Sequence, residues 1–235
     1  MRNHLPPLRR PRRQLNLAAI ASIFSSGVAK VQTTIEPFAE FWDSWNEQQR
    51  TKSGPLWVAL GDSVTQGIGA SDPPKSNLMQ PLHTIRERSG EPWRLINLSM
   101  SGARFQDVVD RQLCVMYDFN LEPSVVSALI GSNDVIWRRN TSAIITDAKR
   151  LVNALPTGTV LSRLSVAKNS ERRLAVNKVF DDAANDGDLH LFQAWDWPSG
   201  ANLWAEDKFH PNDKAHVHLH DNLIQALERI SFDKL

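Results

Sequence analysis

The sequence predicts an α/β fold in which helices cover both faces of an open parallel sheet, preceded by a helical N-terminal extension. Short apolar runs alternate with stretches of helix length between residues 55 and 235. Strands that are apolar on both faces are required in a sheet that helices cover on each side. The regular alternation of strand and helix therefore predicts parallel crossovers and a doubly wound sheet.

Five apolar runs are the predicted strands. Leu56–Leu60 comes first, and Gly61 ends it. The second run ends at Ser99 and the third at Gly131, where the chain favours turns. The four later runs are residues 93–98, 125–130, 159–164 and 189–192. Helices are predicted between the strands and after the last one, at about residues 82–89, 103–116, 141–155, 170–186 and 211–230.

Composition and charge exclude several classes of protein. The 235 residues carry 27 Lys and Arg against 26 Asp and Glu, a formal net charge of +1, so we expect no nucleic-acid partner. With 41% hydrophobic and 23% charged residues, the chain is not disordered throughout. Cys114 is the only cysteine, so no intramolecular disulfide forms, and its apolar neighbours predict a partly buried, inert thiol.

The first fifty residues differ from the rest of the chain. No acidic residue appears before Glu36, whereas the first thirteen positions contain five arginines: Arg2, Arg9, Arg10, Arg12 and Arg13. We expect the first dozen residues to be disordered. The mildly apolar stretch at 15–31 is shorter than the ~20 residues that span a bilayer, so no transmembrane helix is predicted.

Residues 1–50 are expected to form a basic tail with an amphipathic helical extension, and the polar residues 48–55 a linker into a main domain at 55–235. Pro37 predicts a break in the extension, with a second helix that begins after Thr33 and Thr34. Apolar residues recur in the extension at alternating spacings of three and four, which is the pattern of one helix face. They are Phe24, Val28, Val31, Ile35, Phe38, Trp42 and Trp45.

Three interpretations of this apolar face remain open. It packs on the main domain or on a second copy of itself, which we favour. Alternatively, residues 15–45 lie peripherally on an anionic membrane surface, to which the upstream arginines are attracted. In the third interpretation, Arg12 and Arg13 begin an export signal, although the apolar region is weak and no clean cleavage site follows. A cytoplasmic or membrane-peripheral location is therefore favoured over export, and the oligomeric state is left open.

The turn after the first predicted strand contains a serine at a helix start. It reads Gly61-Asp62-Ser63-Val64-Thr65-Gln66-Gly67. Gly61 permits a tight turn, and the backbone N–H of Ser63 lies where developing negative charge is favoured. Ser63 is thus a candidate nucleophile, although a capping serine or a phosphate-binding turn has the same pattern. Thr65 distinguishes the turn from the G-x-S-x-G nucleophile elbow.

Three further segments carry polar groups at element ends. Gly102 follows the second strand and can present its N–H to a ligand, and Asn133 follows the third and can donate to an oxyanion. Near the C-terminus, Asp207 lies three residues before His210, which it can orient as a general base. Each signal alone also fits an ordinary turn or cap. Together, at one edge of one sheet, they supply a nucleophile, a base, an orienting group and oxyanion donors.

These residues resemble the SGNH hydrolases, also called GDSL esterases and lipases, over about residues 55–230. The resemblance rests on four blocks in the family's order: Gly61-Asp62-Ser63-Val64, Gly102, Gly131-Ser132-Asn133-Asp134 and Asp207-Lys208-Phe209-His210. Val64 stands where the family name has Leu. The resemblance implies a flavodoxin-like three-layer sandwich with a five-stranded parallel sheet, and it makes residues 55–235 an SGNH-hydrolase-like catalytic domain.

The resemblance also implies serine ester hydrolysis through an acyl-enzyme. Ser63 would be the nucleophile, His210 the base, and Asp207 the residue that orients His210. The oxyanion hole would comprise the N–H of Ser63, the N–H of Gly102 and the side chain of Asn133. The expected substrate is a small-molecule, lipid or acylated-sugar ester, and no cofactor or metal is expected. An acyltransferase with the same site and a non-catalytic anion-binding module are the alternatives.

Other residues allow a functional and an ordinary interpretation. His216 and His220 have the spacing of metal ligands on a helix, but no acidic or cysteine partner accompanies them, so we predict a solvated helix face. A cluster of tryptophans precedes His210 and either covers the sheet edge, which we favour, or holds a sugar or acyl chain. Its members are Trp195, Trp197 and Trp204. Arg138 and Arg139 mark a solvated helix start or contact an anionic substrate.

Overall fold

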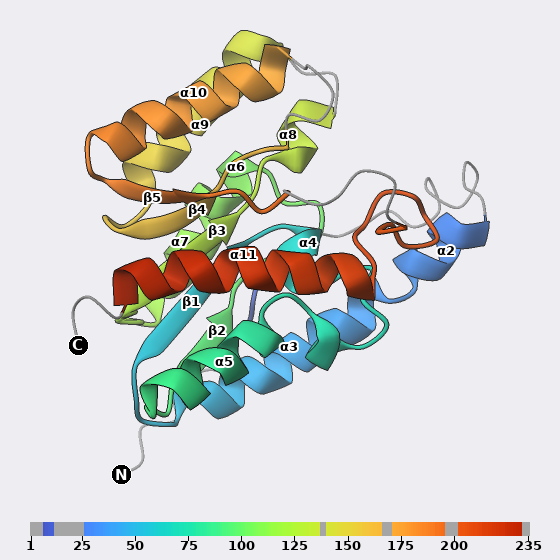
Figure 1. Ribbon diagram of the computed structural model, residues 1–235, viewed down its shortest axis with the longest axis vertical. Helices are drawn as coiled ribbons and strands as arrows, with labels where there is room; N and C mark the ends of the chain where they lie inside the picture. Colours follow the sequence, from blue (N-terminus) through green and yellow to red (C-terminus); the bar gives the residue numbers. More distant parts are fainter. Residues whose placement is uncertain (1–6, 12–25, 137–139, 166–170, 196–201, 232–235) are drawn as a thin grey trace.

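A parallel five-stranded sheet forms the centre of the molecule (Figure 1). The computed structural model describes residues 7–11, 26–136, 140–165, 171–195 and 202–231. The strands lie in the order β2-β1-β3-β4-β5, and every neighbouring pair is parallel. Their bounds are β1 Leu56–Gly61, β2 Arg94–Asn97, β3 Val125–Leu129, β4 Thr159–Ser162 and β5 Leu189–Phe192. The predicted doubly wound sheet is therefore confirmed.

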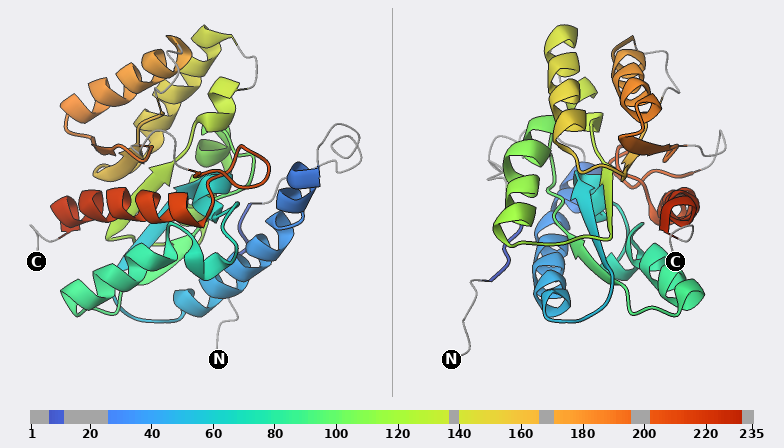
Figure 2. Two further views of the ribbon diagram at one scale, coloured as in Figure 1. Left: turned by 45° about the vertical axis from the view of Figure 1, so that its right-hand side comes forward. Right: turned by 90° about the vertical axis from the view of Figure 1, so that its left-hand side faces the viewer.

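Helices cover both faces of the sheet, as the edge-on view of Figure 2 shows. Alternate residues of β1 enter different cores: Val58 and Leu60 face one, and Trp57 and Ala59 face the other. The first core is closed by helices of residues 105–185, and the second by α3, α5 and α11. The long helices are α3 Ile35–Arg50, α5 Met79–Ser89, α9 Thr141–Ala154, α10 Glu171–Asn185 and α11 Asp213–Ser231. The shorter elements are α2 Ser26–Gln32, α4 Ser63–Gln66, η1 Pro73–Lys75, α6 Phe105–Asp107, η2 Val108–Gln112, α7 Leu113–Asp118 and α8 Ser132–Ile136.

The N-terminal extension packs on the edge of the sheet. It breaks between α2 and α3 at Thr33 and Thr34, and Pro37 lies in the first turn of α3. Trp42 is completely buried in the core beside Trp57 of β1. This burial supports the packing interpretation for the part of the apolar face in α2 and α3. Phe24 and the Arg12-Arg13 pair lie outside the described residues, so the membrane and export interpretations stay predictions.

Three expectations about single segments are wrong. Residues 7–11 are not disordered, because Leu8 is 2% exposed in the first core and Arg10 is 4% exposed. Cys114 is exposed rather than partly buried. His216 is fully buried rather than solvated, because it lies on the same face of α11 as Leu219. Burial lowers the pKa of His216 to about 4, which keeps its imidazole neutral at pH 7.

No helix among the described residues is long and apolar enough to cross a bilayer.

Candidate active site

Three turns that carry predicted site residues lie side by side at the carboxyl edge of the sheet. They follow β2, β1 and β3, which are adjacent strands. The backbone joins them, since Met100 N donates to Gly61 O at 3.1 Å and Asp62 N donates to Leu129 O at 3.3 Å. Ligands of open α/β sheets bind at this edge. The topology thus brings together Ser63, Gly102 and Asn133, which lie in different parts of the sequence.

Ser63 is the first residue of α4 and is buried. Asp62 caps this helix, because its Oδ1 accepts a hydrogen bond from Val64 N at 2.9 Å. Gly61 has a φ of +150°, and a Cβ there would meet the Leu129 carbonyl oxygen at 2.4 Å. Only glycine fits this close approach, so Gly61 fixes the turn that presents Ser63.

Gln112 holds the same turn from the other side. It ends η2, a turn of π-helix, and its buried side chain donates to Gly61 O and accepts from Gly61 N, both at 2.8 Å. The amide therefore satisfies both backbone groups of a residue two positions before Ser63. The sequence prediction missed Gln112, because a single glutamine in an apolar stretch gives no signal of a contact 51 residues away.

His210 lies within hydrogen-bond distance of Ser63. Its Nε2 is 2.9 Å from Ser63 Oγ, and its Nδ1 is 2.5 Å from Asp207 Oδ2. Asp207 Oδ1 accepts from the backbone N–H groups of Phe209 and His210, each at 3.0 Å. These contacts fix the carboxylate on one side and leave its other oxygen for the imidazole.

The environment of Asp207 keeps its carboxylate ionised. Burial opposes ionisation, but the hydrogen bonds from the His210 ring and from two backbone N–H groups outweigh it and hold the pKa of Asp207 below its ordinary value. An ionised carboxylate at Nδ1 keeps the proton on that nitrogen and leaves Nε2 as the acceptor toward Ser63.

The segment before α11 differs from the prediction. The helix begins at Asp213 rather than at Pro211. Pro211 instead forms an antiparallel bridge with Trp204, and Ala205 N donates to His210 O at 2.8 Å. His210 is therefore held by backbone pairing with residues 204 and 205 and not by the first turn of a helix.

The side chain of Asn133 joins the turn after β3 to the segment that contains Gly102. Asn133 lies in α8, and its Nδ2 donates to Ala103 O at 2.9 Å. A side-chain amide has two N–H donors, so this bond orients the group and leaves a second donor. Gly102 has a φ of +74°, in the left-handed region that glycine favours.

Two buried carboxyl groups, Asp62 and Asp134, are the immediate sequence neighbours of Ser63 and Asn133. Burial is the main cause that raises the pKa of Asp62 to about 7, and the charge of Asp134 raises it further. Asp134 Oδ2 accepts from Phe105 N at 3.1 Å, so it links α8 to the start of α6.

A cavity of about 350 Å³ opens beside Ser63 and Asn133. Its apolar wall includes Trp195, Trp204 and Phe209. Trp195 packs against the second core and also lines the cavity, and Trp204 lines it too, so both rings lie where they can contact a ligand. Covering of the sheet edge by these tryptophans stays a prediction. Trp197, Arg138 and Arg139 lie outside the described residues. Within the described part of the chain, no cluster of three metal-ligating side chains occurs.

The family model of the GDSL-like lipase/acylhydrolase family matches residues 59–217, which is more than half of the chain. The chain belongs to this family. It is accordingly a carboxylic ester hydrolase of the GDSL type. The match begins at residue 59, so α2 and α3 of this GDSL hydrolase precede the matched region.

Solved structures share the fold of this GDSL hydrolase at low sequence identity. TesA is 17% identical with a TM-score of 0.63, over 74% of this chain and 99% of that one. The psychrotrophic esterase EstA from Pseudoalteromonas sp. is 21% identical with a TM-score of 0.60, over 74% and 97%. A family 3 carbohydrate esterase from Clostridium thermocellum is 14% identical with a TM-score of 0.61, over 77% and 98%. A search of curated proteins finds no match.

Proposed function

We propose that this GDSL hydrolase cleaves carboxylic esters through an acyl-enzyme on Ser63. The observation that carries the proposal is the continuous hydrogen-bonded chain from Ser63 Oγ through the imidazole of His210 to the carboxylate of Asp207. A nucleophile in contact with a base that a third group orients is the arrangement that nucleophilic acyl transfer requires.

In the first step, Ser63 Oγ attacks the ester carbonyl carbon while its proton passes to His210 Nε2. The tetrahedral intermediate then collapses, the bond to the leaving alcohol breaks, and His210 returns the proton to that alcohol. In the second step, water gives its proton to His210 and attacks the acyl-enzyme. Collapse of this intermediate releases the carboxylic acid and restores the hydroxyl of Ser63.

Three donors are proposed for the oxyanion of both intermediates. They are the N–H of Ser63 at the start of α4, the N–H of Gly102, and the second N–H of the Asn133 side chain. The first two are backbone groups in turns fixed by glycine, and the third is oriented by its bond to Ala103 O. Donors held in place before the reaction stabilise the developing charge without reorganisation.

The cavity supports an ester with an apolar portion of modest size as the substrate. Its volume of about 350 Å³ lies at the lower end of small-molecule sites. The wall formed by Trp195, Trp204 and Phe209 fits an acyl chain or the apolar face of a sugar. Arg173 and Lys208 also line it and add positive charge. Small esters, lipids and acylated sugars all contain such a portion.

The proposal is tested with p-nitrophenyl esters from acetate to palmitate, using the wild-type chain and Ser63→Ala. We expect the wild-type protein to release p-nitrophenol and Ser63→Ala to be inactive on every ester. Addition of an alcohol acceptor, with analysis of the products, distinguishes hydrolysis from acyl transfer. Unchanged activity of Ser63→Ala would refute the assignment of the nucleophile.

A further inference from the structure

Gln66 connects the nucleophile helix to the turn that contains Gly102. It is the last residue of α4, three positions after Ser63, and it is buried. Its Oε1 accepts from the N–H of Ser101 at 2.9 Å and from the hydroxyl of Ser101 at 2.8 Å. The position of the residue directly before Gly102 is therefore set by a side chain of α4.

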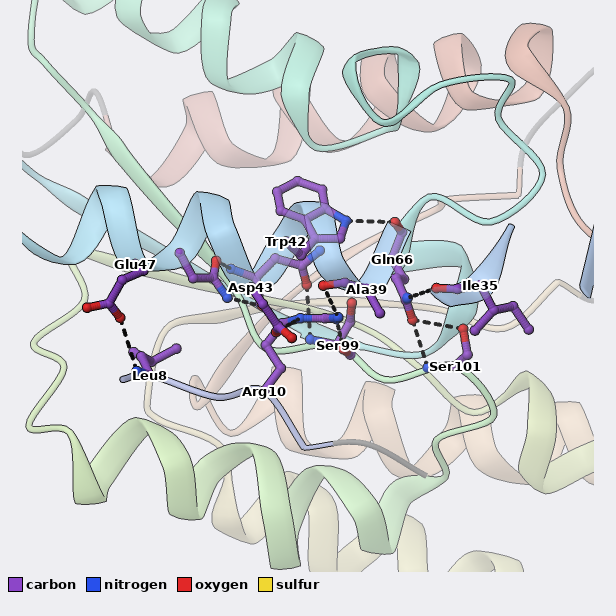
Figure 3. Close-up of polar contacts among 12 residues, drawn as sticks. Leu8, Arg10, Ile35, Ala39, Trp42, Asp43, Glu47, Gln66, Ser99 and Ser101 are labelled. Carbon is purple, nitrogen blue, oxygen red and sulfur yellow. Dashed lines mark hydrogen bonds and ion pairs between the residues drawn. The ribbon is translucent and has the colours of Figure 1, made fainter. Parts of the chain in front are cut away.

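The same glutamine is held by the N-terminal extension. Gln66 Nε2 donates to the carbonyl of Ile35 at 3.2 Å, and the indole of Trp42 donates to the backbone carbonyl of Gln66 at 2.8 Å (Figure 3). Both partners belong to α3, so this helix fixes the side chain and the backbone of Gln66 together. Gln66 is thus a link between α3 and the turn before Gly102.

Arg10 makes a second link from the extension to this turn. Its guanidinium donates through Nη1 to Ser99 O at 2.7 Å and through Nη2 to Ala39 O at 2.8 Å, and Nε pairs with Asp43 at 2.9 Å (Figure 3). A buried guanidinium is stable only when its donors are satisfied, so these contacts determine where residues 7–11 lie. Leu8 N adds a bond to Glu47 Oε2 at 3.1 Å.

The extension takes the place of a neighbouring strand beside β2. β2 is an edge strand, whose outer backbone groups need partners. Asn46 of α3 provides them for Asn97, since its Nδ2 donates to Asn97 O at 2.8 Å and its Oδ1 accepts from Asn97 N at 2.9 Å. Asn97 Oδ1 in turn accepts from Ser99 N at 3.0 Å, which continues the support into the turn.

We propose that the N-terminal extension, residues 7–11 and 26–50, positions the Ser99–Gly102 turn through Gln66 and Arg10, so that the Gly102 N–H meets the oxyanion. Gln66 and Arg10 are positioning residues, because they act through the turn and not on the substrate. The inference rests on the proposed function in assigning Gly102 as an oxyanion donor. It gives a catalytic purpose to a segment that precedes the family match at residue 59.

The test compares Gln66→Met with the control Trp45→Phe. Gln66→Met removes the bonds to Ser101 and Ile35. Trp45→Phe also removes a hydrogen bond between the extension and the sheet, the one from the Trp45 indole to Leu95 O at 3.0 Å. This bond does not involve the Ser99–Gly102 turn. We expect Gln66→Met to lower kcat by about 10- to 100-fold with KM within about 2-fold, because a displaced donor loses part of the 10²–10³-fold effect of a deleted one. Trp45→Phe is expected to retain the wild-type kcat.

A boronic acid inhibitor separates positioning from loss of stability. Ser63 Oγ adds to the boron as its proton passes to His210, and the resulting tetrahedral anion resembles the reaction intermediate. We expect its inhibition constant to rise in Gln66→Met by the same factor as kcat/KM falls. Two milder variants are available should Gln66→Met fail to fold: Arg10→Lys and Ser101→Ala. Arg10→Lys keeps the positive charge beside Asp43 but loses the fork of guanidinium donors.

Failure of the positioning role and failure of the proposed function would give different results. If the wild-type protein hydrolyses esters, and the folded variants at Gln66, Arg10 and Ser101 all match Trp45→Phe in kcat and in boronic acid affinity, the positioning role is overturned while the proposed function stands. If Ser63→Ala is as active as the wild-type protein, the proposed function is overturned and the positioning role with it.

Discussion

The imidazole Nε2 of His210 lies 2.9 Å from Oγ of Ser63, although 147 positions separate the two residues in the sequence. Ser63 is placed by the turn after β1, and His210 by the segment before α11 that pairs with residues 204 and 205. This hydrogen bond thus joins elements from distant parts of the sequence. In the proposed mechanism this bond is the path of the proton in every step.

Asp207→Asn tests the orientation of the imidazole. The Asn Oδ1 can still accept from the backbone N–H groups of Phe209 and His210, so the turn is preserved, but its NH₂ group then faces His210 Nδ1. The imidazole must accept there and carry its proton on Nε2, where it cannot accept from Ser63. We expect kcat to fall by up to about 10⁴-fold with little change in Tm. A kcat equal to that of the wild-type protein would show that Ser63 and His210 suffice.

Asn133→Ala tests the side-chain donor of the oxyanion hole. We expect kcat to fall by about 10²–10³-fold, with KM little changed, because the donor acts on charge that develops in the transition state. Steady-state kinetics and thermal unfolding are measured on the same preparation. A kcat within about 3-fold of wild type in the folded variant would remove Asn133 from the oxyanion hole.

Asp62→Asn tests the buried carboxyl group next to Ser63 in the chain. Burial raises the pKa of Asp62 to about 7 from 3.8, so the folded state binds more protons than the unfolded state between these values. Stability is therefore lost as pH rises from about 4 to 7, by up to about 4 kcal/mol at 1.36 kcal/mol per pKa unit. The asparagine can still accept from Val64 N, and we expect it to reduce this loss.

Urea denaturation from pH 4.5 to pH 8 measures the contribution of Asp62 to the pH dependence of stability. The quantity compared is the difference in unfolding free energy between Asp62→Asn and wild type, because the contributions of the other titrating groups cancel in this difference. The difference is expected to favour the variant increasingly toward pH 8. A difference that does not change with pH would contradict the raised pKa of Asp62.

Gln112→Leu tests the support of the turn at Gly61. The substitution leaves the buried N–H of Gly61 without its partner, whereas Gly61 O keeps the bond from Met100 N. We expect the free energy of unfolding to fall by about 1–3 kcal/mol. Gln106→Leu is the matched control, because Gln106 of α6 donates an exposed hydrogen bond to Asp147 Oδ2. A change within about 0.5 kcal/mol is expected for this variant. Equal losses in the two variants would contradict the role of Gln112.

Trp204→Ala tests whether the aromatic wall of the cavity contacts the substrate. We expect KM for longer p-nitrophenyl esters to rise several-fold with a smaller change in kcat, because lost apolar contact weakens ground-state and transition-state binding alike. Tyr117→Ala removes an exposed aromatic ring in α7, away from the cavity, and should leave KM unchanged. If Trp204→Ala and Tyr117→Ala had the same KM for esters of every chain length, the substrate would not contact the aromatic wall of the cavity.

The sequence predicted the sheet, and it predicted which candidate site residues lie near one another, because both depend on local patterns. Apolar runs identify strands, and parallel strands bring the turns that follow them to one edge. The sequence alone therefore places Ser63, Gly102 and Asn133 close together. His210 and Asp207 are three residues apart, and this spacing alone predicts their contact.

The contacts that support the site could not be predicted in this way. Gln66, Gln112 and Arg10 act through side-chain bonds to backbone groups far along the chain, and such bonds leave no periodicity. Arg10 in particular belongs to a basic stretch that predicts solvent exposure, yet it is buried against Ser99 and Asp43. His216 was misplaced for a related reason, since a polar residue on the buried face of an amphipathic helix is identified only by its neighbours.

The most direct measurement is the site of covalent labelling by a fluorophosphonate probe, determined by peptide mass spectrometry. The hydroxyl oxygen of the nucleophile attacks the phosphorus, fluoride leaves, and the serine proton passes to the base. The account predicts one label per chain on Ser63, loss of esterase activity in proportion to labelling, and greatly slowed labelling in His210→Ala. An enzyme that hydrolyses esters while the probe leaves Ser63 unmodified and labels another residue would contradict it.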